Sequence, residues 1–86
     1  MIHPTQIRLF IKPGCPWCDE AIEWLTSHGV SFATLNVSRD ATARAEMLEL
    51  TGQTKAPSMD VDGQILADFG ADELEAWWVK MGFVLP

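Results

Sequence analysis

The chain has 86 residues, 48% of them hydrophobic, which suffices for one domain with a single core but not for a second. Its formal net charge is −6 and it has only six Lys and Arg, so we expect no nucleic-acid partner. No apolar run approaches the ~20 residues of a membrane span, and the first six residues lack the basic-then-apolar layout of a signal peptide. We therefore expect a single cytoplasmic domain over residues 1–86 that acts as a monomer, without a membrane partner.

Strand-like and helix-like runs alternate along the chain, separated by Pro, Gly and Asp. In chain order we expect a strand at 7–11, a helix starting at Cys15 or Pro16 and ending at Gly29, a strand at 30–37, a helix at 41–50, strands at 58–61 and 64–67, and a helix that starts near Asp72 and ends at Gly82. Pro16 is favoured at a first helical position, because its missing N–H would have no partner there. Asp62-Gly63 is a strong signal for a two-residue hairpin between the third and fourth strands.

This β-α-β-α-β-β-α order determines the expected sheet. Two consecutive strands joined by a helix run parallel with a right-handed crossover, whereas the hairpin at Asp62-Gly63 adds antiparallel strands. The fold class that we predict is therefore α/β, a four-stranded mixed sheet with three helices on its two faces.

Both cysteines of the chain, Cys15 and Cys18, lie three positions apart at a junction between a strand and a helix. Positions i and i+3 are neighbours on a helix, so the two sulfurs are close enough to form a disulfide. Such a bond closes a very small loop and would stabilise the fold by only about 2 kcal/mol on chain-entropy grounds. A disulfide of this kind is suited to being made and broken, and in a cytoplasmic protein the C-x-x-C pattern indicates a redox or metal site.

The two thiols are expected to differ in reactivity. Cys15 lies at the helix start, where unpaired backbone N–H groups and the helix dipole favour a thiolate, and Lys12 adds positive charge nearby. Cys18 lies one turn further along, beneath Trp17. We therefore assign Cys15 as the nucleophile that attacks a substrate disulfide and Cys18 as the resolving thiol that releases the mixed disulfide.

Other interpretations of these residues stay open at this point. The two cysteines could be an inert reduced pair, buried as small apolar side chains. A metal site is a weaker interpretation, because two Cys supply half of a zinc shell and His3 and His28 are isolated, so we expect no metal ligand. Trp17 could form a recognition surface beside the thiols or cover the core. Asp60 is unexpected in a covered strand, and we interpret it as an exposed strand end rather than as a proton relay to Cys18.

Three segments of the chain resemble the glutaredoxin family. Residues 12–18, Lys-Pro-Gly-Cys-Pro-Trp-Cys, are similar to its K-x-x-C-P-Y-C motif with Trp in place of Tyr. Residues 52–57, Gly-Gln-Thr-Lys-Ala-Pro, lie where the family has its T-V-P segment, and residues 61–63, Val-Asp-Gly, match its hairpin. The order of elements agrees with the family from Ile7 to about Met81. The motif at 12–18 is specific for the family because the motif at 52–57 follows it at the family's separation, whereas C-x-x-C alone would not be specific.

The resemblance implies a thioredoxin fold and the reduction of protein disulfides or glutathione mixed disulfides. Glutathione would be the reductant, with no permanently bound cofactor, and the partners would be glutathione and disulfide-containing proteins. The resemblance also implies that Pro57 follows a cis peptide bond and faces the nucleophilic thiol, and that the Ala56 backbone contacts glutathione or substrate. The implied charge contacts to glutathione fall on Lys12, Gln53 and Asp72.

Departures from the family pattern leave the electron donor open. Residues 67–73 lack the family's Gly-Gly pair, and Phe-Gly-Ala-Asp at 69–72 also resembles the F-R-P-D stretch of NrdH redoxins, which take electrons from thioredoxin reductase. Lys55 stands where the family usually has Thr. The alternatives are an NrdH-like redoxin reduced by thioredoxin reductase, a non-enzymatic module that binds an iron–sulfur cluster through Cys15 and glutathione, and an interaction domain with no redox role.

Overall fold

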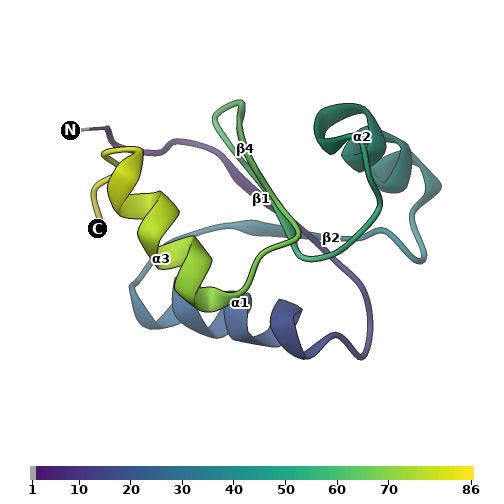
Figure 1. Cartoon of the computed structure of the whole chain (residues 1–86), viewed down its shortest axis with the longest axis horizontal. Coiled ribbons are helices and arrows are strands. Elements are labelled where there is room, and N and C mark those ends of the chain that lie inside the picture. Colours follow the sequence, from purple (N-terminus) through teal and green to yellow (C-terminus); the bar gives the residue numbers. More distant parts are fainter. Residues whose placement is uncertain (1) are drawn as a thin grey trace.

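The elements of the computed structural model, which describes residues 2–86, follow the order β-α-β-α-β-β-α (Figure 1). They are β1 (Ile7–Ile11), α1 (Pro16–Ser27), β2 (Ala33–Asn36), α2 (Ala41–Thr51), β3 (Ser58–Val61), β4 (Gln64–Ala67) and α3 (Ala71–Lys80). The order and the α/β class that the sequence predicts are thereby confirmed. Met1, which begins the segment without a signal-peptide layout, lies outside the described residues. Among residues 2–86 there is no helix with the length and apolar character that a membrane span requires.

The second strand is shorter than the sequence pattern predicts. We expect a strand over 30–37, but β2 occupies only Ala33–Asn36. The Val30 N–H donates to the Leu25 carbonyl oxygen at 2.9 Å, so this stretch completes the C-terminal turn of α1. Gly29 has a φ of +72°, which lets the chain leave the helix in a left-handed conformation. The β-branched Val30 is instead buried in the core beside α1.

The four strands form one mixed sheet in the order β2-β1-β3-β4. β1 pairs parallel with β2 and antiparallel with β3, and β3 pairs antiparallel with β4. The two-residue turn predicted between β3 and β4 is confirmed, with φ values of +51° at Asp62 and +90° at Gly63. Positive φ at both central residues is the requirement of a type I′ turn, which Asp-Gly meets with little strain.

The helices cover the two faces of the sheet unequally. α1 and α3 lie together on one face, and α2 lies alone on the other (Figure 1). β1 alternates accordingly, since Ile7 and Leu9 belong to the core under α1 and α3, whereas Phe10 packs with Met47 of α2. The apolar cluster beneath α2 is the smaller of the two, so the attachment of this helix depends more on polar contacts.

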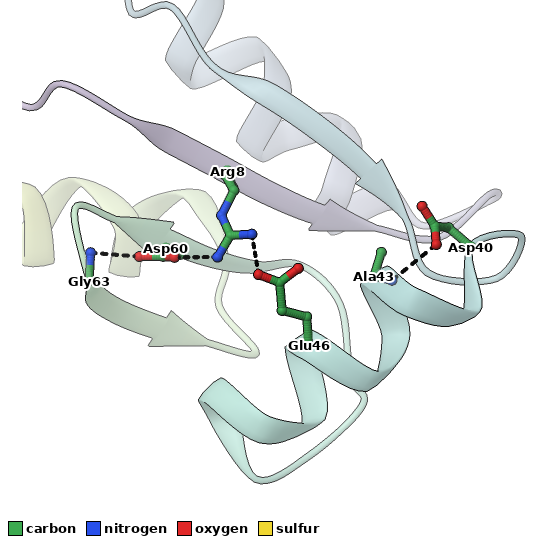
Figure 2. A network of polar contacts seen from close by, with 6 residues as sticks. All are labelled: Arg8, Asp40, Ala43, Glu46, Asp60 and Gly63. Carbon is green, nitrogen blue, oxygen red and sulfur yellow. Dashed lines mark hydrogen bonds and ion pairs between the residues drawn. The ribbon is translucent and has the colours of Figure 1, made fainter.

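Arg8 provides such a contact on the face that α2 covers (Figure 2). Strand pairing places it opposite Asp60, and its guanidinium donates to the Asp60 carboxylate at 2.7 Å and to the Glu46 carboxylate of α2. Asp60 also accepts a hydrogen bond from the Gly63 N–H at 2.8 Å and is only 9% exposed. The interpretation of Asp60 as an exposed strand end is therefore wrong. A relay to Cys18 is also excluded, because α1 lies on the opposite face of the sheet.

The N-terminal segment is fastened to the hairpin through Asp62. Its carboxylate accepts hydrogen bonds from the backbone N–H groups of Thr5 and Gln6, each at 2.8 Å, and from the Thr5 hydroxyl at 2.7 Å. These donors, with the Thr5 N–H the strongest, hold the pKa of Asp62 below its ordinary value. Ile2 forms a bridge with Phe83, so the two ends of the described chain lie side by side.

Candidate active site

Cys15, the nucleophile that the sequence predicts, lies at the start of α1. Gly14 turns the chain with a φ of +69°, and Cys15 is the N-cap residue, extended with φ −103° and ψ 105°. Its sulfur accepts a hydrogen bond from the Cys18 N–H at 3.2 Å, as side-chain oxygens do at other helix starts. Pro16 takes the first helical position, as predicted. Cys15 is partly exposed, so its sulfur borders the surface.

Cys18 has the opposite environment. Only 2% of its surface is exposed, on the side of α1 that faces the sheet. Burial, which is the largest cause, and the hydrogen bond with Cys15 raise the pKa of the Cys18 thiol to about 11. Both cysteines are free thiols in this structure. One sulfur therefore borders the surface at a helix N-terminus, and the other is a buried neutral thiol one turn further along.

The loop between α2 and β3 brings a backbone segment opposite Cys15. The Ala56–Pro57 peptide bond is cis, which confirms the isomer implied by the family resemblance. The Cys15 thiol points toward the Ala56 carbonyl oxygen, with 3.8 Å between sulfur and oxygen. Pro57 is buried, whereas Ala56 is partly exposed. Two segments that are 41 positions apart in the sequence thus meet at the sulfur.

An open groove with a volume of about 360 Å³ surrounds Cys15. It is lined by Lys12, Gly14, Cys15, Pro16, Trp17, Lys55, Ala56 and Asp68. Trp17 is 61% exposed, so it forms a wall of this groove and does not cover the core. The charged lining residues are two Lys and one Asp, which gives the groove a formal charge of +1 in a chain of net charge −6. The groove thus combines a sulfur, an aromatic wall and charges of both signs.

Of the three residues implied as charge contacts to glutathione, Lys12 lines this groove, whereas Gln53 and Asp72 do not. Gln53 is engaged within its own loop: its Nε2 donates to the Ser58 hydroxyl at 3.0 Å and the Thr51 hydroxyl at 3.1 Å. Its Oε1 accepts a hydrogen bond from the Lys55 N–H. Asp72 is exposed in the first turn of α3, outside the groove. Charge contacts with a ligand in the groove therefore fall to other side chains.

Lys55 and Asp68 line the groove although the sequence does not single them out as site residues. Lys55 directly precedes Ala56 and is visible in the sequence only as a departure from the family's usual Thr. Asp68 follows β4 in the stretch before α3 and has a φ of +52°, a left-handed conformation. Lys55 lies within the segment at 52–57 that resembles the family, and Asp68 directly precedes the stretch at 69–72 that resembles NrdH redoxins; these positions are the signal by which both residues could have been found.

Neither histidine joins the two cysteines. His28 lies at the C-terminal end of α1, where its Nδ1 is 2.7 Å from the Trp24 carbonyl oxygen. Its ring stacks on that of Trp24 with 4.1 Å between centroids. His3 lines a separate pocket beside the N-terminal segment. Within residues 2–86, no three His, Cys, Asp or Glu side chains are grouped closely enough to hold a metal ion.

Comparison with known families and proteins assigns this arrangement to a family. The model of the Glutaredoxin family matches residues 7–66, which is more than half of the chain. The chain belongs to the glutaredoxin family. Glutaredoxin 3 of Escherichia coli (strain K12) is 36% identical to it over 72 residues, which cover 84% of each chain. An uncharacterized glutaredoxin-like 8.6 kDa protein in the rubredoxin operon of Clostridium pasteurianum is 35% identical over 69 residues, covering 80% of this chain and 92% of that relative.

The fold of this glutaredoxin is also found in solved structures. The crystal structure of the thioredoxin-like protein BC3987 matches it with a TM-score of 0.76 and 28% sequence identity, covering 83% of this chain and 97% of the other. The thioredoxin fold that the resemblance implies is thereby confirmed. Family and fold together support thiol–disulfide oxidoreductase chemistry in general.

Proposed function

We propose that this glutaredoxin is a dithiol oxidoreductase in which Cys15 attacks a substrate disulfide and Cys18 resolves the mixed disulfide. The asymmetry of the two thiols carries the proposal: Cys15 borders the groove at the N-terminus of α1, and Cys18 is buried with its pKa raised to about 11. A helix N-terminus favours a thiolate over a neutral thiol, because free backbone N–H groups and the positive end of the dipole lie there. One sulfur is thus equipped to begin the reaction and the other to complete it.

The two steps move one electron pair from the dithiol to the substrate. The Cys15 thiolate attacks one sulfur of the substrate disulfide, forms a mixed disulfide with it and expels the other sulfur as a thiolate. Cys18 gives its proton to the expelled thiolate and attacks the Cys15 sulfur, which releases the second substrate sulfur as a thiolate that solvent protonates. The protein ends as the Cys15–Cys18 disulfide and the substrate as two thiols.

The environment of Cys18 supports this order of steps. A pKa near 11 keeps its thiol protonated at neutral pH, so Cys18 does not compete with Cys15 for the substrate. The thiolate expelled in the first step is a base, and it is produced at the moment when the Cys18 proton has to leave. Burial therefore delays the resolving attack until the mixed disulfide has formed.

We propose glutathione as the reductant that regenerates the dithiol. Glutathione carries two carboxylates and one ammonium group, and the groove offers Lys12 and Lys55 for the carboxylates and Asp68 for the ammonium. Two glutathione molecules would reduce the protein disulfide and leave as oxidised glutathione, so glutathione acts as a co-substrate. A dithiol that works in this direction needs a reducing compartment, which is why we place the protein in the cytoplasm.

Thioredoxin reductase is the second candidate donor. Residues 69–72 resemble the corresponding stretch of NrdH redoxins, and BC3987, with the same fold, is a thioredoxin-like protein. The two donors are separated by following NADPH oxidation during reduction of hydroxyethyl disulfide, with either glutathione and glutathione reductase or thioredoxin reductase alone. We expect turnover with the glutathione system. Turnover with thioredoxin reductase alone would support the redoxin function instead.

The roles of the two thiols are tested by single substitutions. Cys15→Ser is expected to abolish turnover of a glutathione mixed disulfide, because it removes the attacking sulfur. Cys18→Ser should retain that turnover and lose the reduction of protein disulfides, which requires the resolving thiol. A Cys15→Ser variant that keeps the wild-type rate in the hydroxyethyl disulfide assay would refute the assignment.

A further inference from the structure

Two polar side chains, Ser58 and Gln53, form hydrogen bonds with the backbone of the loop that carries Ala56. The Ser58 hydroxyl, which is fully buried, donates to the Lys55 carbonyl oxygen at 2.8 Å and accepts from the Gln53 Nε2 at 3.0 Å. The Gln53 Oε1 accepts a hydrogen bond from the Lys55 N–H. Both polar backbone groups of Lys55 are therefore bound by these two side chains.

These contacts set the direction of the next backbone N–H. The Lys55 carbonyl and the Ala56 N–H belong to one peptide unit, which is planar and trans, so the two groups point in opposite directions. Because Ser58 holds the carbonyl toward the interior, the Ala56 N–H points away from the interior. In the described part of the chain this N–H has no acceptor, and the Ala56 carbonyl oxygen has only the Cys15 thiol, at 3.8 Å.

The free N–H of Ala56, and its C=O, which has only the weak thiol donor of Cys15, form a short edge beside the nucleophile to which a substrate backbone can add. A peptidic disulfide carries the complementary amide groups close to its sulfur, whereas a small non-peptidic disulfide has none. The benefit of this pairing depends on how firmly the Lys55–Ala56 peptide unit is held before the substrate arrives, because a mobile donor must be ordered on binding.

We propose that Ser58 and Gln53 are positioning residues that fix the Lys55–Ala56 peptide unit for backbone pairing with peptidic disulfides. This inference rests on the proposed oxidoreductase function and gives Gln53 a role different from the direct glutathione contact that the family resemblance implies. Thr51 extends the arrangement, since its hydroxyl accepts from the Gln53 Nε2 at 3.1 Å and donates to the Met47 carbonyl oxygen at 2.7 Å. The loop is thereby tied to the end of α2.

The test compares a peptidic with a non-peptidic disulfide in a single turnover of the fully reduced protein. Reduced protein is mixed in a stopped-flow instrument with increasing concentrations of oxidised glutathione or of hydroxyethyl disulfide, and its Trp fluorescence is followed. The dithiol itself supplies the electron pair, so no external donor is needed. For Ser58→Ala and Gln53→Met we expect the half-saturating concentration of oxidised glutathione to rise about three- to tenfold. This is the effect of losing the net contribution of one hydrogen bond between the Ala56 backbone and the substrate. The limiting rate, and both parameters for hydroxyethyl disulfide, should stay within about twofold of wild type.

Two matched variants separate positioning from general destabilisation. Ser58→Thr keeps the hydroxyl and is expected to restore the wild-type behaviour, and Thr54→Ala, whose side chain makes no hydrogen bond within residues 2–86, is the control from the same loop. If the half-saturating concentration in Ser58→Ala rises equally for both disulfides, the role of Ser58 is merely structural and the inference is overturned. The inference is also overturned if this concentration rises for neither disulfide. A wild-type protein that neither disulfide oxidises would instead refute the proposed function itself.

Discussion

The buried Cys18 thiol gives a direct test of how the two steps are ordered. In a Cys15→Ser variant Cys18 is the one thiol left, and burial, the largest cause of its raised pKa, is retained. A rise in pKa from the ordinary 9.0 to about 11 lowers the thiolate fraction at neutral pH about 100-fold, to roughly 1 in 10,000. Loss of the hydrogen bond with Cys15 removes a smaller contribution of the same sign, so the pKa in the variant should lie between these two values.

The assay is the pH dependence of thiolate formation in the Cys15→Ser variant, followed by ultraviolet absorbance and independently by alkylation with iodoacetamide. We expect a midpoint above 9.0 for the folded variant and a midpoint near the ordinary value after unfolding in urea. Alkylation should accelerate about tenfold with each pH unit across the neutral range, because the thiolate is the reactive species. A folded midpoint at or below 9.0 would refute the reasoning that burial keeps Cys18 neutral.

The raised pKa of Cys18 also makes stability depend on pH. Its folded pKa lies above the unfolded value, so the folded chain holds this proton more tightly. The resulting stabilisation is fully present below pH 9.0 and is lost as the pH rises toward 11. The free energy of unfolding in urea should therefore fall more steeply across this window in the wild type than in a Cys18→Ala variant, which lacks the titrating group.

Three further predictions concern charged side chains. Asp60→Ala leaves the partly buried Arg8 with one carboxylate partner fewer and should lower the free energy of unfolding in urea by about 1–3 kcal/mol; an unchanged midpoint would contradict a stabilising contact. Lys55→Glu should raise the KM for glutathione about two- to fivefold at low salt and less at high salt, whereas Lys80→Glu, in the last turn of α3, should not. Asp62→Asn removes the carboxylate whose pKa the N-terminal segment lowers, so its urea midpoint should lie below that of wild type at neutral pH and converge with it below pH 3.8.

Most element boundaries follow from residues whose effect on the backbone is local. Pro16 predicts the start of α1 because it needs no hydrogen-bond acceptor, and Asp62-Gly63 predicts the hairpin because both positions adopt positive φ. The predicted strand at 30–37 is longer than β2 because that prediction, too, used only the local preference of each residue. Val30 has the side chain of a strand residue, but its N–H is used to complete the last turn of α1, and composition alone does not reveal that competition.

The dithiol is predictable because its geometry is local, whereas the groove around it is not. Cys15 and Cys18 are neighbours on any helix that starts at residue 16. Which other side chains reach the groove depends on how two distant loops fold against α1. Gln53 has the right chemistry for a ligand contact, yet its amide is used by its own loop, and Lys55 from that loop lines the groove instead.

The polar residues of β3 show why burial was harder to predict than secondary structure. Ser58 and Asp60 alternate with apolar residues, a pattern typical of a half-exposed strand, yet all four residues of β3 are buried. Both side chains lie on the face covered by α2, where Arg8 neutralises the carboxylate and the loop of Gln53 satisfies the hydroxyl. Apolar burial is non-directional, so it cannot fix the orientation of a peptide unit, whereas hydrogen bonds can. Polar contacts therefore suit the loop that presents Ala56 to the nucleophile, and substitution of Ser58 or Gln53 should alter the affinity for a peptidic disulfide before it alters the fold.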